Sequence, residues 1–180
     1  ASSLGQCLLC EVGKYSSVPG ISASTDCVEC PSGKHAFESG SVDCRGCAQG
    51  KYQHKDASNG VTTCELCDAG KFSNGETQFC SLCAPGRYAD VTGLAQCAMC
   101  GPGSYTDADA EGSTACRHLC PVGRFSITAG SKSVDDCKLC RAGTYQFSNG
   151  SSTCLPCPPG SFASAPGMPS CSLCPLHTYS

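Results

Sequence analysis

Residues 137–157 read CKLCRAGTYQFSNGSSTCLPC, a stretch that begins and ends on a Cys-x-x-Cys pair. Between the two pairs stand Gly143, the aromatic Tyr145 two positions later, and the dipeptide Asn149-Gly150. Asn-Gly between two extended segments is a strong signal for a tight β-hairpin turn. The stretch therefore predicts a short hairpin whose two ends are held by cysteines.

The same arrangement repeats along all 180 residues, and it accounts for all 20 cysteines. The close pairs are Cys7/Cys10, Cys27/Cys30, Cys44/Cys47, Cys64/Cys67, Cys80/Cys83, Cys97/Cys100, Cys116/Cys120, Cys137/Cys140, Cys154/Cys157 and Cys171/Cys174. First cysteines recur every 16 to 21 residues, and Gly-x-aromatic follows eight of the ten pairs. His35 takes the aromatic place in the second unit, and His177 takes the glycine place in the last. We expect residues 1–180 to form one continuous array of about ten repeats, with both ends falling inside a repeat.

The composition excludes an ordinary globular core. Leu, Ile, Val and Phe together number 27, and Trp is absent. A disordered chain would also need a high net charge, whereas this chain carries −3. We therefore predict a small disulfide-rich, all-β or irregular fold: an elongated array of disulfide-stapled hairpins with almost no helix. So many cysteines place the protein in an oxidising compartment, extracellular or at the cell surface.

The pattern C-x-x-C-x-x-G-x-Y/F resembles the cysteine-rich repeats of the ephrin-receptor type. More loosely, it is similar to the first module of tumour-necrosis-factor-receptor cysteine-rich domains. Such repeats occur in receptor ectodomains, secreted scaffolds and long surface glycoproteins, including flagellar-hair (mastigoneme) fibres. The resemblance implies an extended, non-enzymatic, extracellular architecture.

Two local disulfide connectivities fit the spacing. The sequential scheme closes the base of each hairpin by joining Cys10 to Cys27, Cys30 to Cys44, Cys47 to Cys64, Cys67 to Cys80, Cys83 to Cys97, Cys100 to Cys116, Cys120 to Cys137, Cys140 to Cys154 and Cys157 to Cys171. The crossed scheme locks alternate units by Cys7 to Cys27 with Cys10 to Cys30, and so on. That scheme would make the modules alternate, and the Gly-x-aromatic signature does not alternate. We favour the sequential scheme, and the crossed scheme stays open.

The sequential scheme leaves Cys7 and Cys174 without partners. Placing Ser180 before Ala1 gives a well-formed unit with 12 residues between Cys174 and Cys7, as many as between Cys67 and Cys80. We therefore expect inter-segment disulfides, in which Cys174 meets a cysteine equivalent to Cys7 in a head-to-tail copy or in a flanking repeat.

The cysteine spacing and one acidic segment each resemble a metal site in part. Zinc sites also use Cys-x-x-Cys pairs, but several of the gaps here, which run from 12 to 16 residues, are too short. The segment 107–112 begins like a calcium loop, yet His118 stands where the bidentate Glu should be. We predict no metal and no cofactor. The four histidines are scattered, and no catalytic arrangement is identifiable, so we expect no enzyme.

Three surface features bear on partners. Lys or Arg precedes the ring position in six units and forms a basic stripe that could bind glycans or merely balance nearby acids: Lys14, Lys34, Lys51, Lys71, Arg87 and Arg124. The rings are expected to cover disulfides and pack on the next unit. Asn149-Gly150-Ser151 is an N-glycosylation acceptor in an exposed turn. Charged residues make up only 15% of the chain, which argues against nucleic acid as a partner.

Uniform units favour a structural role, as a rod-like segment of a surface fibre or adhesive glycoprotein. No apolar stretch is long enough to predict a membrane span. The alternative is a receptor or scaffold ectodomain that recognises a protein. The stretched Cys116/Cys120 pair and the loop 107–112 would then be the first candidates for its binding region.

Overall fold

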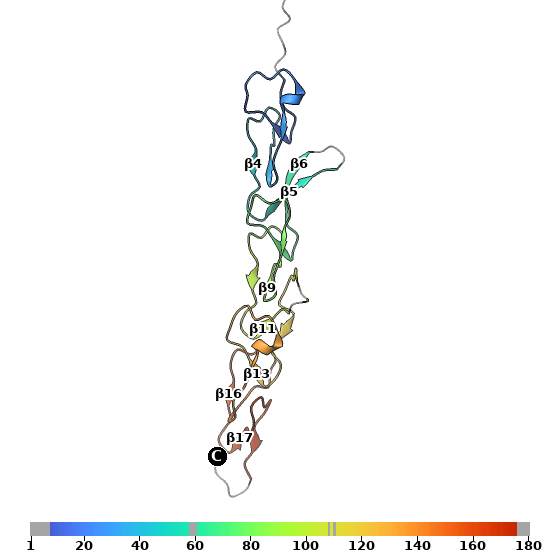
Figure 1. Ribbon diagram of the computed structural model, residues 1–180. Helices are drawn as coiled ribbons and strands as arrows, with labels where there is room; N and C mark the ends of the chain where they lie inside the picture. The colour runs from blue at the N-terminus through green and yellow to red at the C-terminus, as the bar shows by residue number, and fades with distance from the viewer. Residues whose placement is uncertain (1–7, 58–60, 108, 110, 176–180) are drawn as a thin grey trace, which may run out of the picture. The chain divides into compact units, whose positions relative to one another are not determined.

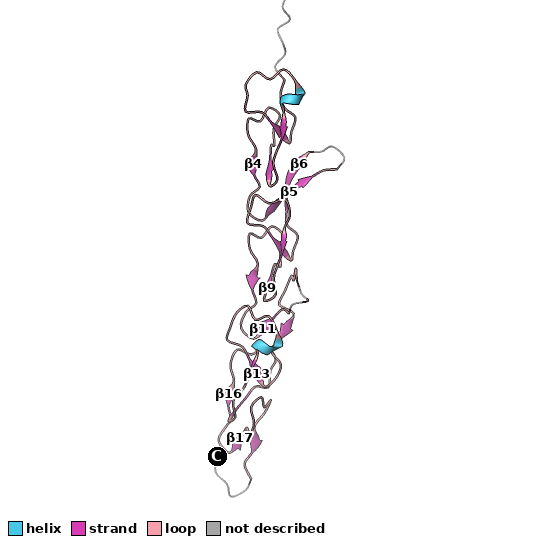
Figure 2. Cartoon of the chain, in the orientation of Figure 1, coloured by secondary structure: helices cyan, strands magenta, loops and turns pink. Residues whose placement is uncertain are grey.

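The structure, a computed structural model, describes residues 8–57, 61–107, 109 and 111–175. In this part of the chain, consecutive strands pair into nine antiparallel two-stranded sheets separated by turns and loops (Figure 1, Figure 2). The helical content there consists of two three-residue 3-10 turns, η1 (Ser24–Asp26) and η2 (Val134–Asp136). The predicted fold class, a small disulfide-rich array of β-hairpins, is confirmed.

The sheets are numbered below as hairpins 1 to 9 in chain order, and the contact between hairpins 1 and 2 is called junction 1/2. The strand pairs are β1 (Lys14–Tyr15) with β2 (Val28–Glu29), β3 (Lys34–His35) with β4 (Arg45–Gly46), β5 (Lys51–Lys55) with β6 (Thr62–Leu66), β7 (Lys71–Phe72) with β8 (Ser81–Leu82), β9 (Arg87–Tyr88) with β10 (Ala98–Met99), β11 (Ser104–Tyr105) with β12 (His118–Leu119), β13 (Arg124–Phe125) with β14 (Lys138–Leu139), β15 (Thr144–Tyr145) with β16 (Leu155–Pro156), and β17 (Ser161–Phe162) with β18 (Ser172–Leu173).

Each hairpin begins at a glycine, and every hairpin turn that the structure describes also contains one. In hairpin 8, Gly143 leads from the cysteine pair into β15 with φ of 79°, and Gly150 in the turn has φ of 77°. Both values lie in the left-handed region that glycine enters without a steric penalty. A ladder of two residues per strand cannot stand alone in water, so each hairpin depends on its disulfide and its neighbours.

Buried side chains confirm that cysteine replaces an apolar core. Among the described residues, ten of the fourteen buried apolar side chains are cysteines, and the others are Ile21, Ala36, Ala89 and Ala163. Leucine, phenylalanine and valine are exposed or half-exposed along most hairpins. The interior of each unit is therefore made of disulfides with small residues around them.

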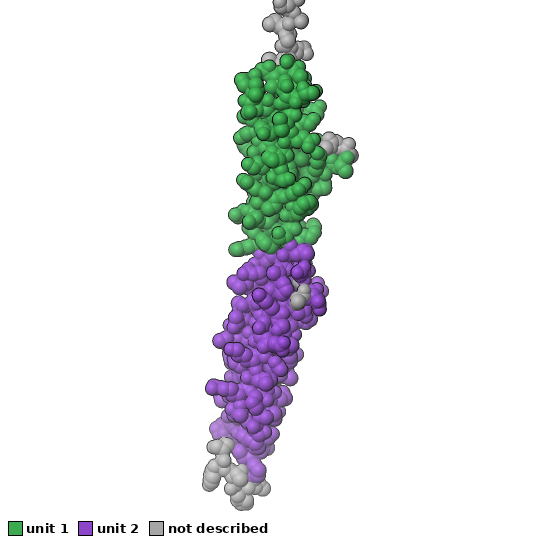
Figure 3. Space-filling model, viewed as in Figure 1, with its two compact units in different colours: residues 1–81, 91–96 green, residues 82–90, 97–180 purple. Residues whose placement is uncertain are grey.

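The chain divides into two compact units (Figure 3). Unit 1 comprises Ala1–Ser81 and Val91–Gln96, which hold hairpins 1 to 4 and the tip of hairpin 5. Unit 2 comprises Leu82–Asp90 and Cys97–Ser180, which hold the remainder of hairpin 5 and hairpins 6 to 9. Within each unit the hairpins follow one another in chain order, as the colours of Figure 1 show.

Candidate functional site: the junctions between hairpins

Nine disulfides close the hairpin bases, with Cα–Cα distances of 5.5 to 5.8 Å. Each joins the second cysteine of one pair to the first of the next, which is the sequential scheme; none of the crossed bridges is present among the described residues. Cys174 is free in the described part of the chain. Cys7 and His177 lie outside the described residues.

Neighbouring hairpins are joined by a repeated set of three main-chain hydrogen bonds. At junction 7/8, Gly123 N donates to Gln146 O (2.7 Å), Ser126 N to Ser151 O (3.2 Å), and Gly150 N to Cys120 O (2.8 Å). The equivalent three bonds are present at junctions 1/2, 3/4, 5/6, 6/7 and 8/9. Because the bonds use backbone groups, the junction tolerates variation in the side chains around it.

The motif glycine also contacts the second hairpin along. At Gly103 an added Cβ would lie 2.1 Å from Gly150 O, and at Gly50 it would lie 1.9 Å from Gly93 O. The same approach occurs at Gly33, Gly86 and Gly123, against the turns that contain Glu76, Gly130 and Gly167. No side chain fits into such a space. Hairpins 2, 3, 5, 6 and 7 therefore contact the second hairpin along as well as the next one, and the glycine of the motif makes the second contact possible.

The residue after the ring is buried in hairpins 2 to 9, a feature that the sequence reasoning missed. These residues are Ala36, Gln53, Ser73, Ala89, Thr106, Ser126, Gln146 and Ala163, with exposed fractions of 7% or less. The position accepts the bond from the motif glycine of the preceding hairpin at six junctions. The sequence does contain a signal for this burial, because the position is always Ala, Ser, Thr or Gln and never a bulky apolar residue.

The rings themselves are only half-buried, with Phe162 39% exposed. His35 is the exception, because it is 3% exposed and its Nδ1 lies 2.8 Å from the Cys64 Sγ of the next hairpin. His35 therefore makes the expected contact between a ring and the disulfide of the following hairpin.

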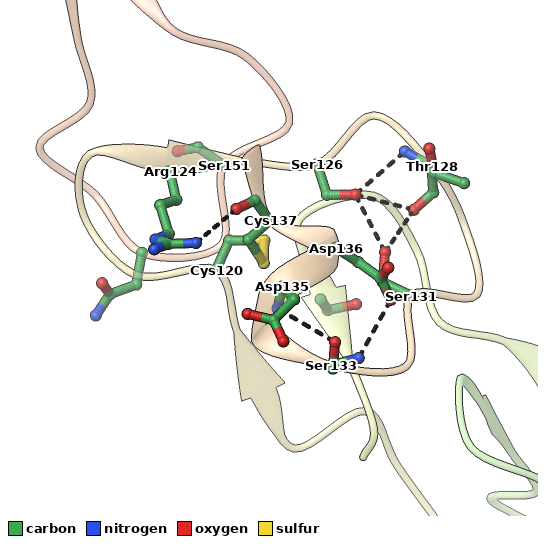
Figure 4. Close-up of a disulfide and its surroundings, with 12 residues drawn as sticks. Cys120, Arg124, Ser126, Thr128, Ser131, Ser133, Asp135, Asp136, Cys137 and Ser151 are labelled. Carbon is green, nitrogen blue, oxygen red and sulfur yellow. Dashed lines mark hydrogen bonds between the residues drawn. A yellow bond between two sulfur atoms is a disulfide. The ribbon is translucent and has the colours of Figure 1, made fainter. Parts of the chain in front are cut away.

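Several basic side chains of the stripe bond within the chain. Arg124 Nη1 donates to Cys137 O at 3.0 Å, beside the Cys120–Cys137 disulfide (Figure 4), and Arg87 makes the equivalent bond to Cys97 O. Lys71 pairs with Asp68 at 3.2 Å. The two arginines therefore bond to the backbone of their own hairpins, and Lys71 is paired with an acid of its own hairpin.

The loop of hairpin 7 is ordered by hydroxyl groups (Figure 4). Ser126 Oγ lies 3.1 Å from Ser131 Oγ and accepts from Thr128 N, and Ser133 Oγ accepts from Asp135 N at the start of η2. Such local bonds substitute for a longer ladder. The Ser- and Thr-rich composition therefore serves the hairpin loops.

Neither candidate metal site has the required donors. His35, Cys47 and Cys64 bring three donor atoms within 4.8 Å, but both sulfurs belong to one disulfide and are not thiolates. In segment 107–112, which begins like a calcium loop, Asp107 Oδ2 lies 3.4 Å from His118 Nε2, and His118 stacks on Tyr105 with ring centroids 5.1 Å apart. Positions 108 and 110 of that loop lie outside the described residues.

Asn149 is exposed in the turn of hairpin 8. Its Oδ1 accepts from Val122 N at 3.0 Å, so the side chain carbonyl is held toward hairpin 7. Nδ2, the atom to which an N-glycan would be attached, takes no part in that bond.

A family model described as tyrosine-protein kinase ephrin type A/B receptor-like matches residues 70–110, 86–137 and 134–168, which together span more than half of the chain. No curated protein matches the sequence. Among the described residues, no helix has the length and apolar character needed to cross a membrane.

Proposed function

The chain belongs to the tyrosine-protein kinase ephrin type A/B receptor-like family, a disulfide-rich repeat family of extracellular proteins, and on that premise we propose that it is a non-enzymatic, rod-like segment of a surface fibre or adhesive glycoprotein. The observation that carries the proposal is the junction. The same three backbone bonds recur at six junctions, and the same glycine contact recurs at five motif glycines. Repeats that contact only near neighbours extend in one direction as they are added, as in other solenoids.

The proposed partner is another copy or a flanking repeat, attached head to tail. At Gly143 and Gly160 an added Cβ would meet no described atom within 4 Å, unlike the motif glycines before them. Leu173 is 84% exposed, whereas the equivalent Leu139 is 47% exposed and lies against Gly167. These positions on hairpins 8 and 9 are open where hairpins 2, 3, 5, 6 and 7 receive the second hairpin along, and the free Cys174 lies beside them, since its N donates to Gly160 O at 2.9 Å.

Peptide mapping of the non-reduced protein tests this partner. The expected product is a disulfide-linked peptide pair that joins Cys174 to Cys7 or to an equivalent cysteine. Recovery of Cys174 as a free thiol in assembled material would refute the covalent head-to-tail contact, while leaving the rod itself to be tested separately.

Small-angle X-ray scattering tests the rod. A compact chain of this length would have a radius of gyration of about 16 Å. Stacked hairpins that rise on the order of 10 Å each would approach roughly 100 Å in length, and a rod of that length has a radius of gyration of about 30 Å. A value near the compact one would overturn the proposed function.

A receptor or scaffold ectodomain is the second candidate, and hairpin 3 favours it. Its strands β5 and β6 pair over five residues, whereas the other eight sheets of the described chain pair over two. In Figure 1 these strands lead out from the side of unit 1. The loop of hairpin 6, expected from the sequence to be irregular, instead keeps the regular bonds of junctions 5/6 and 6/7. Replacing β5 and β6 with the two-residue ladder of hairpin 2 would abolish partner binding if this candidate is right, and would leave fibre assembly intact if it is not.

A further inference from the structure

Junction 2/3 is built differently from the regular junctions. At those junctions the motif glycine donates to a main-chain carbonyl of the next hairpin. Gly33 N instead donates to Oε1 of the Gln53 side chain at 2.9 Å, and Gln53 Nε2 donates to Lys34 O at 2.5 Å. Gln53 is 7% exposed and pairs with Cys64 inside the long ladder of hairpin 3. A side chain therefore spans the gap that backbone groups close at the six regular junctions.

His35 fills the same junction. Its ring meets Phe37 edge-on with centroids 3.8 Å apart, and its Nδ1 lies 2.8 Å from Cys64 Sγ and 3.7 Å from Cys47 Sγ. Disulfide sulfur carries no proton, so Nδ1–H donates and Nε2 keeps its lone pair. Nε2 is buried and has no hydrogen-bond partner among the described residues.

A second proton on this ring would have no acceptor. It would also place a buried positive charge near Arg45, the cross-strand partner of His35 on β4, and near Lys51 on β5. Glu38 and Asp43 line the same hollow as His35 and Arg45, but the charges that act on the ring are those of the two cations. Burial first, and then these two cations, hold the pKa of His35 below its ordinary value.

We propose that junction 2/3 is an acid-sensitive hinge within unit 1, at which protonation of His35 expels the ring and separates Gly33 from Gln53 while the regular junctions stay closed. The proposal goes beyond the structural role and holds whether or not the protein forms fibres. Tyr or Phe occupies this place in hairpins 1 and 3 to 9, so those hairpins have no titratable imidazole there.

The direction of the effect follows from linkage. A pKa that is lowered in the closed state means that the open state binds the proton more tightly, so closure is unaffected above the ordinary value of 6.5 and weakens as the pH falls below it. At pH 5.0 the protonated form of an exposed imidazole exceeds the neutral form by about 30-fold. This ratio is the upper limit of the change in the equilibrium between the closed and the open junction.

Amide hydrogen exchange at pH 7.5 and 5.0, corrected for intrinsic exchange, measures this opening. The Gly33 amide is expected to lose several-fold to at most about 30-fold in protection at pH 5.0. The Gly50 amide, which donates to Ser73 O across the regular junction 3/4, is the internal reference and should change little. His35→Phe restores the aromatic of the other hairpins and should abolish the loss.

His54→Phe is the matched control, because His54 is an exposed histidine on the same hairpin pair and its removal should leave the loss unchanged. Equal loss in H35F and in the unmodified protein, or equal loss at Gly33 and Gly50, would overturn the hinge. If H35F does not fold, NMR titration of the His35 imidazole in the unmodified protein decides, since a midpoint at or above 6.5 contradicts the proposal.

Discussion

Substituting Gly103 with Ala tests the contact between a hairpin and the second hairpin along. Gly103 has φ of 78°, and an alanine Cβ there would lie 2.1 Å from Gly150 O, a backbone atom that cannot rotate away. The matched control is Gly143→Ala, where φ is 79° and an added Cβ meets no described atom within 4 Å. Both variants adopt the same unfavourable backbone region, and only Gly103→Ala creates the clash.

The free-energy cost of Gly103→Ala has two parts, the backbone conformation and the clash. The left-handed conformation costs an alanine about 1 kcal/mol, which is the whole expected effect at Gly143. The clash at Gly103 must also lengthen the bonds from Gly150 N to Cys120 O (2.8 Å) and from Gly103 N to Ser126 O (2.9 Å). Each such bond contributes about 1 kcal/mol, so Gly103→Ala should cost about 3 kcal/mol in total.

Hydrogen exchange of the Gly150 amide, with all disulfides intact, is the assay. The difference of about 2 kcal/mol between the variants corresponds to about 30-fold less protection in Gly103→Ala than in Gly143→Ala. Equal protection in the two variants would refute the reasoning, because backbone conformation alone would then explain why glycine stands in the motif.

Three further outcomes are expected. Reduction with a dithiol should abolish the near-ultraviolet circular dichroism and the protease resistance of the protein, whereas a chelator should change neither. Loss of structure on chelation alone would contradict the disulfide assignment. Gln53→Leu should leave the Gly33 amide without its acceptor and lower the stability of junction 2/3 by about 1 to 3 kcal/mol. Hydrogen exchange of the Gly33 amide measures this loss, and an unchanged exchange rate would show that the Gln53 bond is dispensable. Asn149→Gln should remove an amidase-sensitive glycan from protein secreted by eukaryotic cells; identical electrophoretic mobility of the two proteins would exclude modification at this site.

The hairpins could be predicted because their signals are local. Gly143, Tyr145 and the Asn149-Gly150 turn lie between two cysteine pairs, so one stretch of 21 residues contains everything that defines one hairpin. The apolar shortage likewise required that cysteines form the interior, and the buried residues agree. The glycine signature also favoured the sequential pairing that the structure shows.

The junctions could not be predicted in the same way. Gly103 approaches Gly150, a residue 47 positions away, and nothing in the local sequence says which turn will meet a given glycine. The buried position after the ring was missed because Thr106 and Gln146 look like solvent-facing residues of a polar strand. Their burial arises from the next hairpin covering them.

The sequence by itself determined the repeat, its cysteine framework, its turns and its lack of an apolar core, because each of these depends on composition or on residues within one unit. Tertiary structure alone decided that five of the hairpins contact the second hairpin along, and that His35 is enclosed at one of the nine ring positions of the described chain. Gly33 and His35 follow the common spacing, yet the five-residue ladder of the next hairpin replaces their backbone contacts with the side chain of Gln53. Such a difference depends on how far the neighbouring backbone lies, which is fixed only when the hairpins are packed together.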